Sequence, residues 1–100
     1  MIKLIFICSP YAGDIEKNTE AAKAYCRNTM HLGIPIAPHI YFTQFLNDEN
    51  VPERIAGMRA GLHLLKLCDE IHVYGEPTDG MIQEIELARK LKKLIVYKTA

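Results

Sequence analysis

The chain has 100 residues, of which 49% are hydrophobic and 24% are charged, a composition typical of a soluble globular protein rather than of a disordered segment. Twelve basic residues balance twelve acidic ones, so no overall field draws the chain to nucleic acid or to a lipid surface. We therefore expect no nucleic-acid partner and no membrane contact. A chain of this length has no room for a second core, so one domain should span residues 1–100.

The three cysteines, Cys8, Cys26 and Cys68, are odd in number and show no paired spacing. This usage is typical of reduced thiols in a cytosolic protein and not of a disulfide framework. The apolar run near the N-terminus is too short for a membrane span, and its pattern differs from that of a signal peptide. We therefore expect a cytoplasmic protein.

The first predicted elements are a strand and a long helix. Residues 2–8 form a near-continuous apolar run, rich in β-branched and aromatic side chains, which predicts a strand buried on both faces. Asp14 is a candidate N-cap for a helix that runs to about Leu32, and Gly33 supplies its stop. The side chains expected on the inner face of this helix are Ile15, Ala22, Cys26 and Met30.

A short strand and a second helix follow. Residues 34–37 predict the strand, and the stretch 40–50 is expected to be an irregular excursion over the sheet edge, because it ends in a polar loop. The second helix should start near Pro52, which fits a first helical turn, and end before Asp69. Its apolar stripe is expected to be Ile55, Met58, Leu62 and Leu65.

The remaining elements complete a regular alternation of strand and helix. Residues 70–74 predict a third strand, 75–80 a turn-rich loop, 81–92 a third helix and 94–97 a last strand. Right-handed crossovers between such strands give a parallel sheet with helices on both faces. The expected fold is therefore α/β: a three-layer α/β/α Rossmann-like (flavodoxin-like) domain with a parallel sheet of four to five strands.

Glu84 is the sharpest single feature of the sequence. The inward stripe of the third predicted helix is Met81, Ile85, Ala88 and Leu91, and Glu84 lies on the same side. A carboxylate on a half-buried face near a helix N-terminus has little water around it and is a candidate nucleophile or base. The alternative is a solvated charge on a slightly rotated helix. The residues alone leave both interpretations open.

Other candidates lie in the loops that follow the strands, because ligands bind outside the carboxyl ends of the strands in an open parallel sheet. Ser9 and Thr78 each lie beside a glycine-containing turn and offer a hydroxyl to a phosphate, with helix capping and turn formation as the alternative role. His39 faces the predicted crevice, either as a pocket residue or as an ordinary packed or surface histidine. Neither loop has a G-x-G-x-x-G or P-loop pattern.

We expect no metal site and no cofactor. The four histidines lack metal-ligand spacing, among themselves or with cysteine. Cys8 lies at a strand end, but no histidine partner for it can be inferred, so a thiol nucleophile is not expected.

Four segments of the chain resemble the nucleoside 2-deoxyribosyltransferase-like superfamily: IFICSPYAGD, PIAPHIYF, LLKLCDEIHVYGEPTDGM and above all IQEIELARKLKK. The resemblance covers nearly the whole chain. It is strongest to a small branch of that superfamily that is often found in phage and mobile-element settings. The last segment combines a glutamate in the first helical turn with a preceding glycine loop, in the expected order.

The resemblance implies a nucleoside or nucleoside 5′-monophosphate N-glycosidase or 2-deoxyribosyltransferase. It places on Glu84 the nucleophile that attacks the anomeric carbon, and on Ser9 and Thr78 the hydroxyls that hold a 5′-phosphate. It implies a small-molecule nucleoside or nucleotide as substrate and a homodimer or larger homo-oligomer. The substrate-binding residues that follow from it are Ser9, Pro10, Tyr11, Gly13, His39, Thr78, Asp79 and Gly80.

Two departures from the family motivate an alternative function. Relatives carry an aspartate, in the helix before the third strand, that contacts sugar or base, and the matching position here is Gly61. The chain also ends at Ala100, short of the C-terminal extension that often completes the site in relatives. The alternative is therefore a non-catalytic nucleotide-binding protein that senses or sequesters its ligand.

Overall fold

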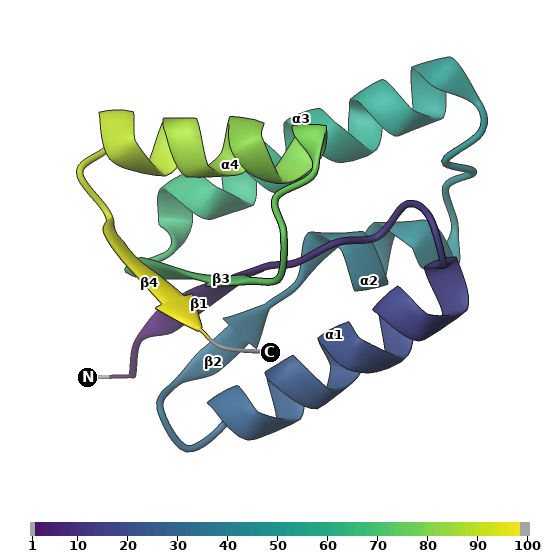
Figure 1. The fold of residues 1–100 in the computed structure, drawn as a ribbon. Helices are drawn as coiled ribbons and strands as arrows, with labels where there is room; N and C mark the ends of the chain where they lie inside the picture. The colour runs from purple at the N-terminus through teal and green to yellow at the C-terminus, as the bar shows by residue number, and fades with distance from the viewer. Residues whose placement is uncertain (1, 99–100) are drawn as a thin grey trace.

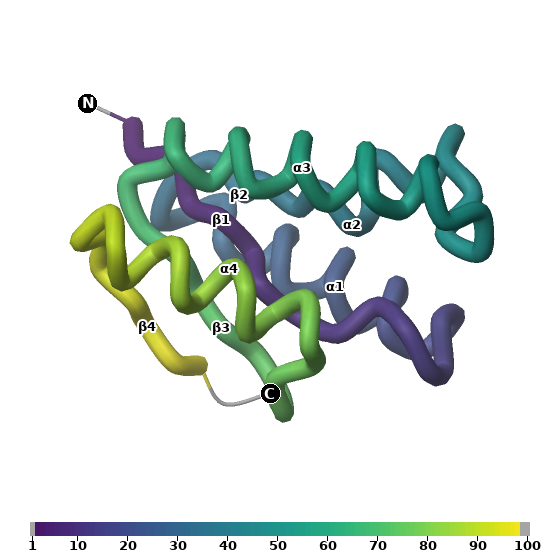
Figure 2. Tube along the Cα trace, turned by 90° about the horizontal axis from the view of Figure 1, so that it is seen from above, coloured from purple at the N-terminus to yellow at the C-terminus, as the bar shows by residue number. Residues whose placement is uncertain are grey.

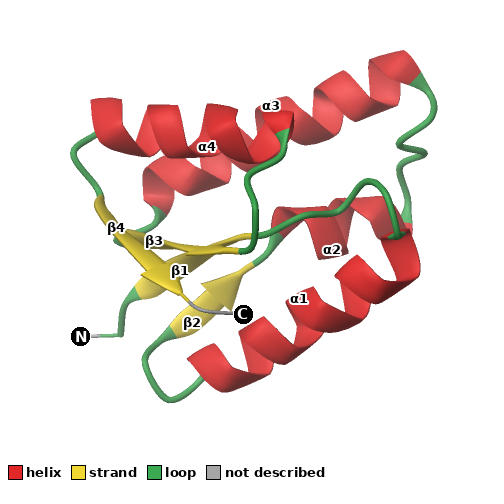
Figure 3. Ribbon diagram, viewed as in Figure 1, coloured by secondary structure: helices red, strands yellow, loops and turns green. Residues whose placement is uncertain are grey.

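The computed structural model describes residues 2–98, in which strands and helices alternate along the chain (Figure 1). The strands are β1 (Leu4–Cys8), β2 (Ile34–Ile36), β3 (Glu70–Tyr74) and β4 (Leu94–Lys98). The helices are α1 (Ile15–Thr29), α2 (Pro38–Tyr41), α3 (Val51–Leu67) and α4 (Asp79–Lys90), and a short 3₁₀ turn, η1 (Phe42–Gln44), follows α2. Figure 3 shows this division into helix, strand and loop.

The four strands form one parallel sheet in the order β2-β1-β3-β4. Helix α1 covers one face of the sheet, and α3 and α4 run side by side over the other (Figures 1 and 2). The short α2 lies at the carboxyl end of β2 and packs against both α1 and α3. The predicted α/β fold is confirmed, with four strands in its sheet.

Strand β1 lies between β2 and β3 and is buried on both faces, as its apolar run predicts. Phe6 and Cys8 point toward α3 and α4, into a core that includes Leu65. Ile5 and Ile7 point toward α1 and pack with Tyr74 in a second hydrophobic cluster on that face of the sheet. Burial of each such side chain contributes about 1.5–3 kcal/mol to folding. The chain leaves β1 toward β2 on one side and returns as β3 on the other, so the carboxyl ends of β1 and β3 flank a topological switch point.

Helix α1 begins where the sequence predicts but differs from the prediction at its ends. The Asp14 carboxylate caps it by accepting a hydrogen bond from the Lys17 backbone N–H at 3.2 Å. The prediction that Ile15 and Met30 lie on the inner face of the helix is wrong, because these side chains are 47% and 64% exposed. A helix of 15 residues is about 22 Å long, whereas a strand of five is about 17 Å, so the ends of α1 overhang the sheet.

Gly33 does not stop α1 through a left-handed conformation, since the glycines with positive φ within residues 2–98 are Gly13 and Gly75. The helix ends at Thr29, whose carbonyl oxygen accepts hydrogen bonds from the N–H groups of Leu32 and Gly33. A Cβ added to Gly33 would lie 2.6 Å from the Lys3 carbonyl oxygen. Glycine is needed here because the chain enters β2 in close contact with the start of β1.

The stretch 40–50, expected to be irregular, contains the end of α2 and the 3₁₀ turn η1. Helix α3 then begins at Val51, next to the expected Pro52, and its N-terminal half extends beyond the sheet (Figure 1). Ile55, predicted to lie inside, is therefore 43% exposed, whereas Leu65 over the sheet is fully buried.

Helix α4 begins at Asp79, two residues before the predicted start, because Thr78 supplies its cap. Met81, Ile85 and Ala88 are buried as predicted, but Leu91 follows the end of the helix and is 38% exposed. None of the helices in residues 2–98 is long and apolar enough to cross a membrane.

Candidate functional site

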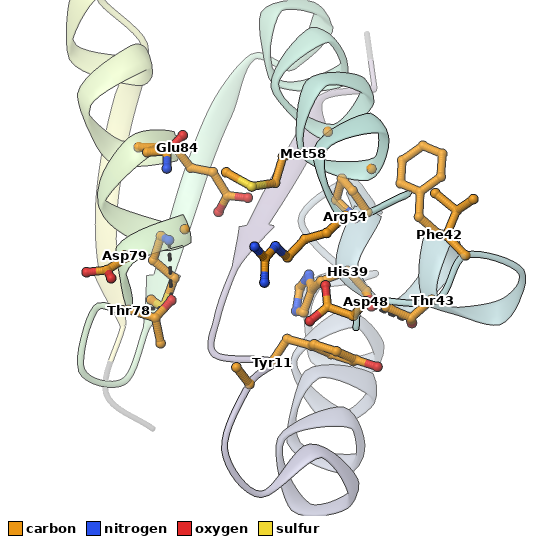
Figure 4. A pocket seen from close by; sticks show the side chains of 18 of the residues that line it. Tyr11, His39, Phe42, Thr43, Asp48, Arg54, Met58, Thr78, Asp79 and Glu84 are labelled. Atoms are coloured by element: carbon orange, nitrogen blue, oxygen red, sulfur yellow. Dashed lines mark hydrogen bonds between the residues drawn. The ribbon is translucent and has the colours of Figure 1, made fainter. Parts of the chain in front are cut away.

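A pocket of about 600 Å³ lies at the carboxyl ends of β1 and β3, at the switch point of the sheet (Figure 4). Its walls are the loop after β1, the α2–η1 segment, the N-terminal half of α3 and the first turns of α4. Seven of the predicted site residues line it: Ser9, Tyr11, His39, Thr78, Asp79, Gly80 and Glu84.

Two predicted residues, Pro10 and Gly13, lie outside the pocket lining and shape the loop instead. Gly13 has φ 98° and lies just before the cap of α1. Pro10 lies close to Gly75, which has φ 74°, because a Cβ on that glycine would be 3.5 Å from the proline Cγ. The contact between Pro10 and Gly75 therefore holds the loops after β1 and β3 side by side.

The Glu84 side chain points from α4 into the pocket (Figure 4). Met81 and Ala88, one turn away on either side, are buried against the sheet, and this fixes the helix so that Glu84 faces the pocket. Burial raises the pKa of the Glu84 carboxyl group to about 7, against the smaller lowering effect of a hydrogen bond with the Cys8 thiol. The carboxyl group therefore titrates near neutral pH, in the range where a nucleophile or a proton-transfer group is useful.

Cys8 is fully buried at the end of β1, with its Sγ atom 3.9 Å from the Met81 carbonyl oxygen. Burial, and then the charge of Glu84, raise the pKa of the Cys8 thiol far above its usual range. A thiol that stays protonated is a weak hydrogen-bond donor and a poor nucleophile.

Ser9 and His39 form a hydrogen bond inside the pocket, with Ser9 Oγ 2.8 Å from His39 Nε2. Burial lowers the pKa of His39 to about 4, so its imidazole is neutral at neutral pH. The Thr43 hydroxyl donates to the His39 carbonyl oxygen at 2.7 Å, which fastens α2 to η1. The bond between Ser9 and His39 therefore links the loop after β1 to the wall formed by α2.

Thr78 caps helix α4, the alternative role that its sequence context indicates. Its Oγ1 atom accepts a hydrogen bond from the Met81 N–H at 3.3 Å, and the Thr78 N–H contacts the Met81 sulfur at 3.4 Å. The threonine hydroxyl still lines the pocket and keeps its own proton to donate.

The sequence did not predict the wall that faces Glu84. It carries the apolar side chains Phe42, Leu46 and Met58 together with the charged side chains Asp48 and Arg54. No motif marks these residues, and their meeting depends on the fold of the 40–50 stretch and on the overhang of α3.

Gly61, where the family resemblance expects an aspartate, is buried in the same wall. A Cβ at this position would lie 3.4 Å from the Pro38 Cβ, so α2 and α3 are closely packed there. Within residues 2–98, no three side chains of His, Cys, Asp or Glu come together as a metal ion would require.

Comparisons with known proteins agree with this fold. Residues 3–98 match the model of a family described as a domain of unknown function, DUF7768. No curated protein matches the chain. The solved 2-deoxyribosyltransferase of the psychrotolerant bacterium Bacillus psychrosaccharolyticus, described as a biocatalyst for the synthesis of nucleosides, superimposes with a TM-score of 0.71. The match covers 96% of this chain and 72% of that one at 17% identity, and it shows a common fold.

Proposed function

We propose that this chain, which belongs to the DUF7768 family, is an N-glycosidase or 2-deoxyribosyltransferase of nucleosides or nucleoside 5′-monophosphates, with Glu84 as the nucleophile. The observation that carries the proposal is a carboxyl group with a pKa of about 7, pointing into a pocket of about 600 Å³ at the switch point of the sheet. A fold in common with a 2-deoxyribosyltransferase supports it.

The chemistry is a double displacement at the anomeric carbon. In the first step, a carboxylate oxygen of Glu84 bonds to C1′ while the C1′–N bond breaks, and the bonding electron pair leaves with the base, which takes up a proton. In the second step, water or another base attacks C1′ and releases the Glu84 carboxylate. Water gives hydrolysis, and a second base gives transfer.

The loops after β1 and β3 supply the groups that hold the sugar and a 5′-phosphate. Ser9 and Thr78 line the pocket with their hydroxyl-bearing side chains, and Tyr11 lines it as well. Gly80 lies in the first turn of α4, where backbone N–H groups without helical partners favour an anionic group.

The test is base release. The protein is incubated with deoxynucleosides and with their 5′-monophosphates, alone or with a second free base, and the products are separated by chromatography. We expect free or exchanged base with the native chain and a loss of rate of about a hundredfold or more with Glu84→Gln. Glu86→Gln is the matched control, because Glu86 is on the same helix but exposed and outside this pocket. Equal rates for the native chain and Glu84→Gln, or no release from any substrate, would refute the proposal.

A second candidate function is nucleotide binding without turnover, and the position of Gly61 favours it. The family resemblance expects a carboxylate at this position, where the chain has a glycine that packs against Pro38. This candidate predicts that a nucleotide raises the melting temperature of the protein, since a ligand that binds only the native state stabilises it, while no base is released. Turnover by the native chain would exclude it.

A further inference from the structure

The α2–α3 side of the pocket forms a wall that the proposed chemistry does not use. We call it the α3 wall and define it by Phe42, Leu46, Asp48, Arg54 and Met58, all of which line the pocket. Figure 4 shows the Arg54 guanidinium and the Met58 side chain directed from α3 into the hollow, across from Glu84 and Thr78. Glu84, the proposed nucleophile, and the α3 wall therefore lie on opposite sides of the pocket.

Hydrogen bonds hold Asp48 and Arg54 in one local unit. Asn50 caps α3 by accepting from the Glu53 N–H at 3.1 Å, and the Glu53 carboxylate accepts from the Asn47 N–H at 2.9 Å. The loop that carries Asp48 is thus fastened to the first turn of α3, which carries Arg54. These contacts bring the backbone that carries Asp48 next to the backbone that carries Arg54.

The charges of the lining argue against a phosphate at this wall. Arg54 is the one arginine or lysine among the described lining residues, and two carboxylates on its own side of the pocket, those of Asp48 and Glu53, also line it. A phosphate dianion at this wall would be repelled by these two carboxylates. Within residues 2–98, no carboxylate lies within 4 Å of the Arg54 guanidinium, so its donors are available to a neutral polar ligand.

We propose that Asp48 and Arg54 are the residues that select the nucleobase, an inference that rests on the proposed function. A guanidinium only donates hydrogen bonds and an ionised carboxylate only accepts them. The polar edge of a nucleobase carries ring-nitrogen or carbonyl acceptors next to N–H donors, so Arg54 binds an acceptor and Asp48 a neighbouring N–H. The flat faces of the base lie against the apolar side chains of the α3 wall.

The experiment measures dissociation constants, by calorimetry, for the four deoxynucleosides and their 5′-monophosphates. The variants are Arg54→Gln, Arg54→Lys and Asp48→Asn. The controls are Arg59→Gln on the same helix and Glu49→Gln on the same loop, two exposed side chains outside the pocket lining. Circular dichroism and melting temperature establish that each variant folds.

We expect the native chain to bind the four deoxynucleosides with different dissociation constants. In each of the three variants, the ratio between the largest and the smallest of these constants should change by about fivefold or more. Arg54→Lys is included because it keeps the charge but loses the planar fork of donors, so base selection should fall while binding of a phosphate would persist. The ratio between a nucleoside and its monophosphate should stay as in the native chain, and the controls should leave both ratios unchanged.

Two results would overturn the inference. The base ranking could persist in all three variants, or the variants could change only the preference between nucleoside and monophosphate, which would make Arg54 a phosphate ligand. In either case the native chain still binds nucleosides and the proposed function stands. Failure of the native chain to bind any nucleoside or nucleotide is a different result, which refutes the proposed function and this inference together.

Discussion

Ser9 Oγ lies 2.8 Å from His39 Nε2, and this hydrogen bond joins the end of the central strand to the first turn of α2. Both residues line the pocket, and His39 has its pKa lowered to about 4 by burial. A neutral imidazole is thus built into the folded state, whereas in the unfolded chain the same group takes up a proton near pH 6.5.

This difference predicts a loss of stability in acid. The pKa of His39 is lower in the folded state than in the unfolded state. The contribution of the neutral imidazole to the free energy of unfolding is therefore complete above pH 6.5 and is lost as the pH falls toward 4. We expect the free energy of unfolding of the native chain, relative to His39→Gln, to fall by up to about 3 kcal/mol between pH 7 and pH 4. Urea unfolding at the two pH values measures it, with the exposed His63→Gln as control. A difference that does not vary with pH would contradict a neutral His39 in the folded state.

The raised pKa of Glu84 predicts that stability changes with pH in the opposite direction. Its folded pKa of about 7 is above the unfolded value of 4.5, so its contribution is complete below pH 4.5 and is lost as the pH rises through 7. We expect Glu84→Gln to be more stable than the native chain by up to about 3 kcal/mol at pH 8 and equally stable at pH 4. Chemical denaturation at both pH values tests this. If Glu86→Gln, the exposed control, gave the same gain, the effect would be general charge repulsion.

Base release should also depend on pH. The nucleophile must be ionised, so the proposed rate rises with pH with a midpoint near 7, the pKa of Glu84. The Cys8 thiol lowers that pKa, so Cys8→Ala should move the midpoint upward. The measurement is the rate of base release between pH 5 and 9 for both proteins. A flat profile in this range would exclude Glu84 as the group whose ionisation limits the reaction.

Gly33 predicts a local steric effect on stability. A Cβ there would lie 2.6 Å from the Lys3 carbonyl oxygen, and backbone cannot move aside cheaply. We expect Gly33→Ala to cost about 1–3 kcal/mol of unfolding free energy. Gly80→Ala is the matched control, because nothing lies within 4 Å of its added Cβ and alanine is the better helix former. Thermal unfolding that ranks Gly33→Ala at or above the native chain would contradict this contact.

Thr78 has two proposed roles, the cap of α4 and a ligand of the 5′-phosphate, and measurements of stability and of ligand binding distinguish them. Thr78→Ala removes the cap of α4 and should cost about 0.5–2 kcal/mol of stability, whereas Thr78→Ser should restore most of it. If the hydroxyl also holds a 5′-phosphate, Thr78→Ala weakens the binding of a monophosphate more than that of its nucleoside. If Thr78→Ala weakened the binding of the monophosphate and of the nucleoside equally, capping of α4 would be the role of Thr78.

The sequence predicted well what depends on short stretches of chain. The run 2–8 is a buried strand because its neighbours in the chain are all apolar, and Asp14 caps α1 because it directly precedes the helix. Glu84 and Thr78 are placed at the pocket for a related reason. In a parallel sheet the carboxyl ends of the strands share one edge, so loops that follow strands meet there.

The sequence could not predict what depends on relative lengths and on packing. Ile15, Met30 and Ile55 have helical spacing but lie where their helices extend beyond a short sheet. Asp48 and Arg54 come together only through the turns of the 40–50 stretch, whose local signals conflict. A homodimer or larger assembly, a cytoplasmic location, the absence of a nucleic-acid partner, a single domain over 1–100 and the phage-associated branch stay predictions.

The overhang of α3 has a consequence for the motions of the protein. The buried positions of this helix, Gly61 and Leu65, are both in its second half, and the first half depends on its capping contacts and on the neighbouring turns. Helical segments with few buried contacts open more often than those docked on a sheet. Amide protons of 54–58 should therefore exchange with deuterium faster than those of 61–67, and a bound nucleoside should slow the first group toward the second.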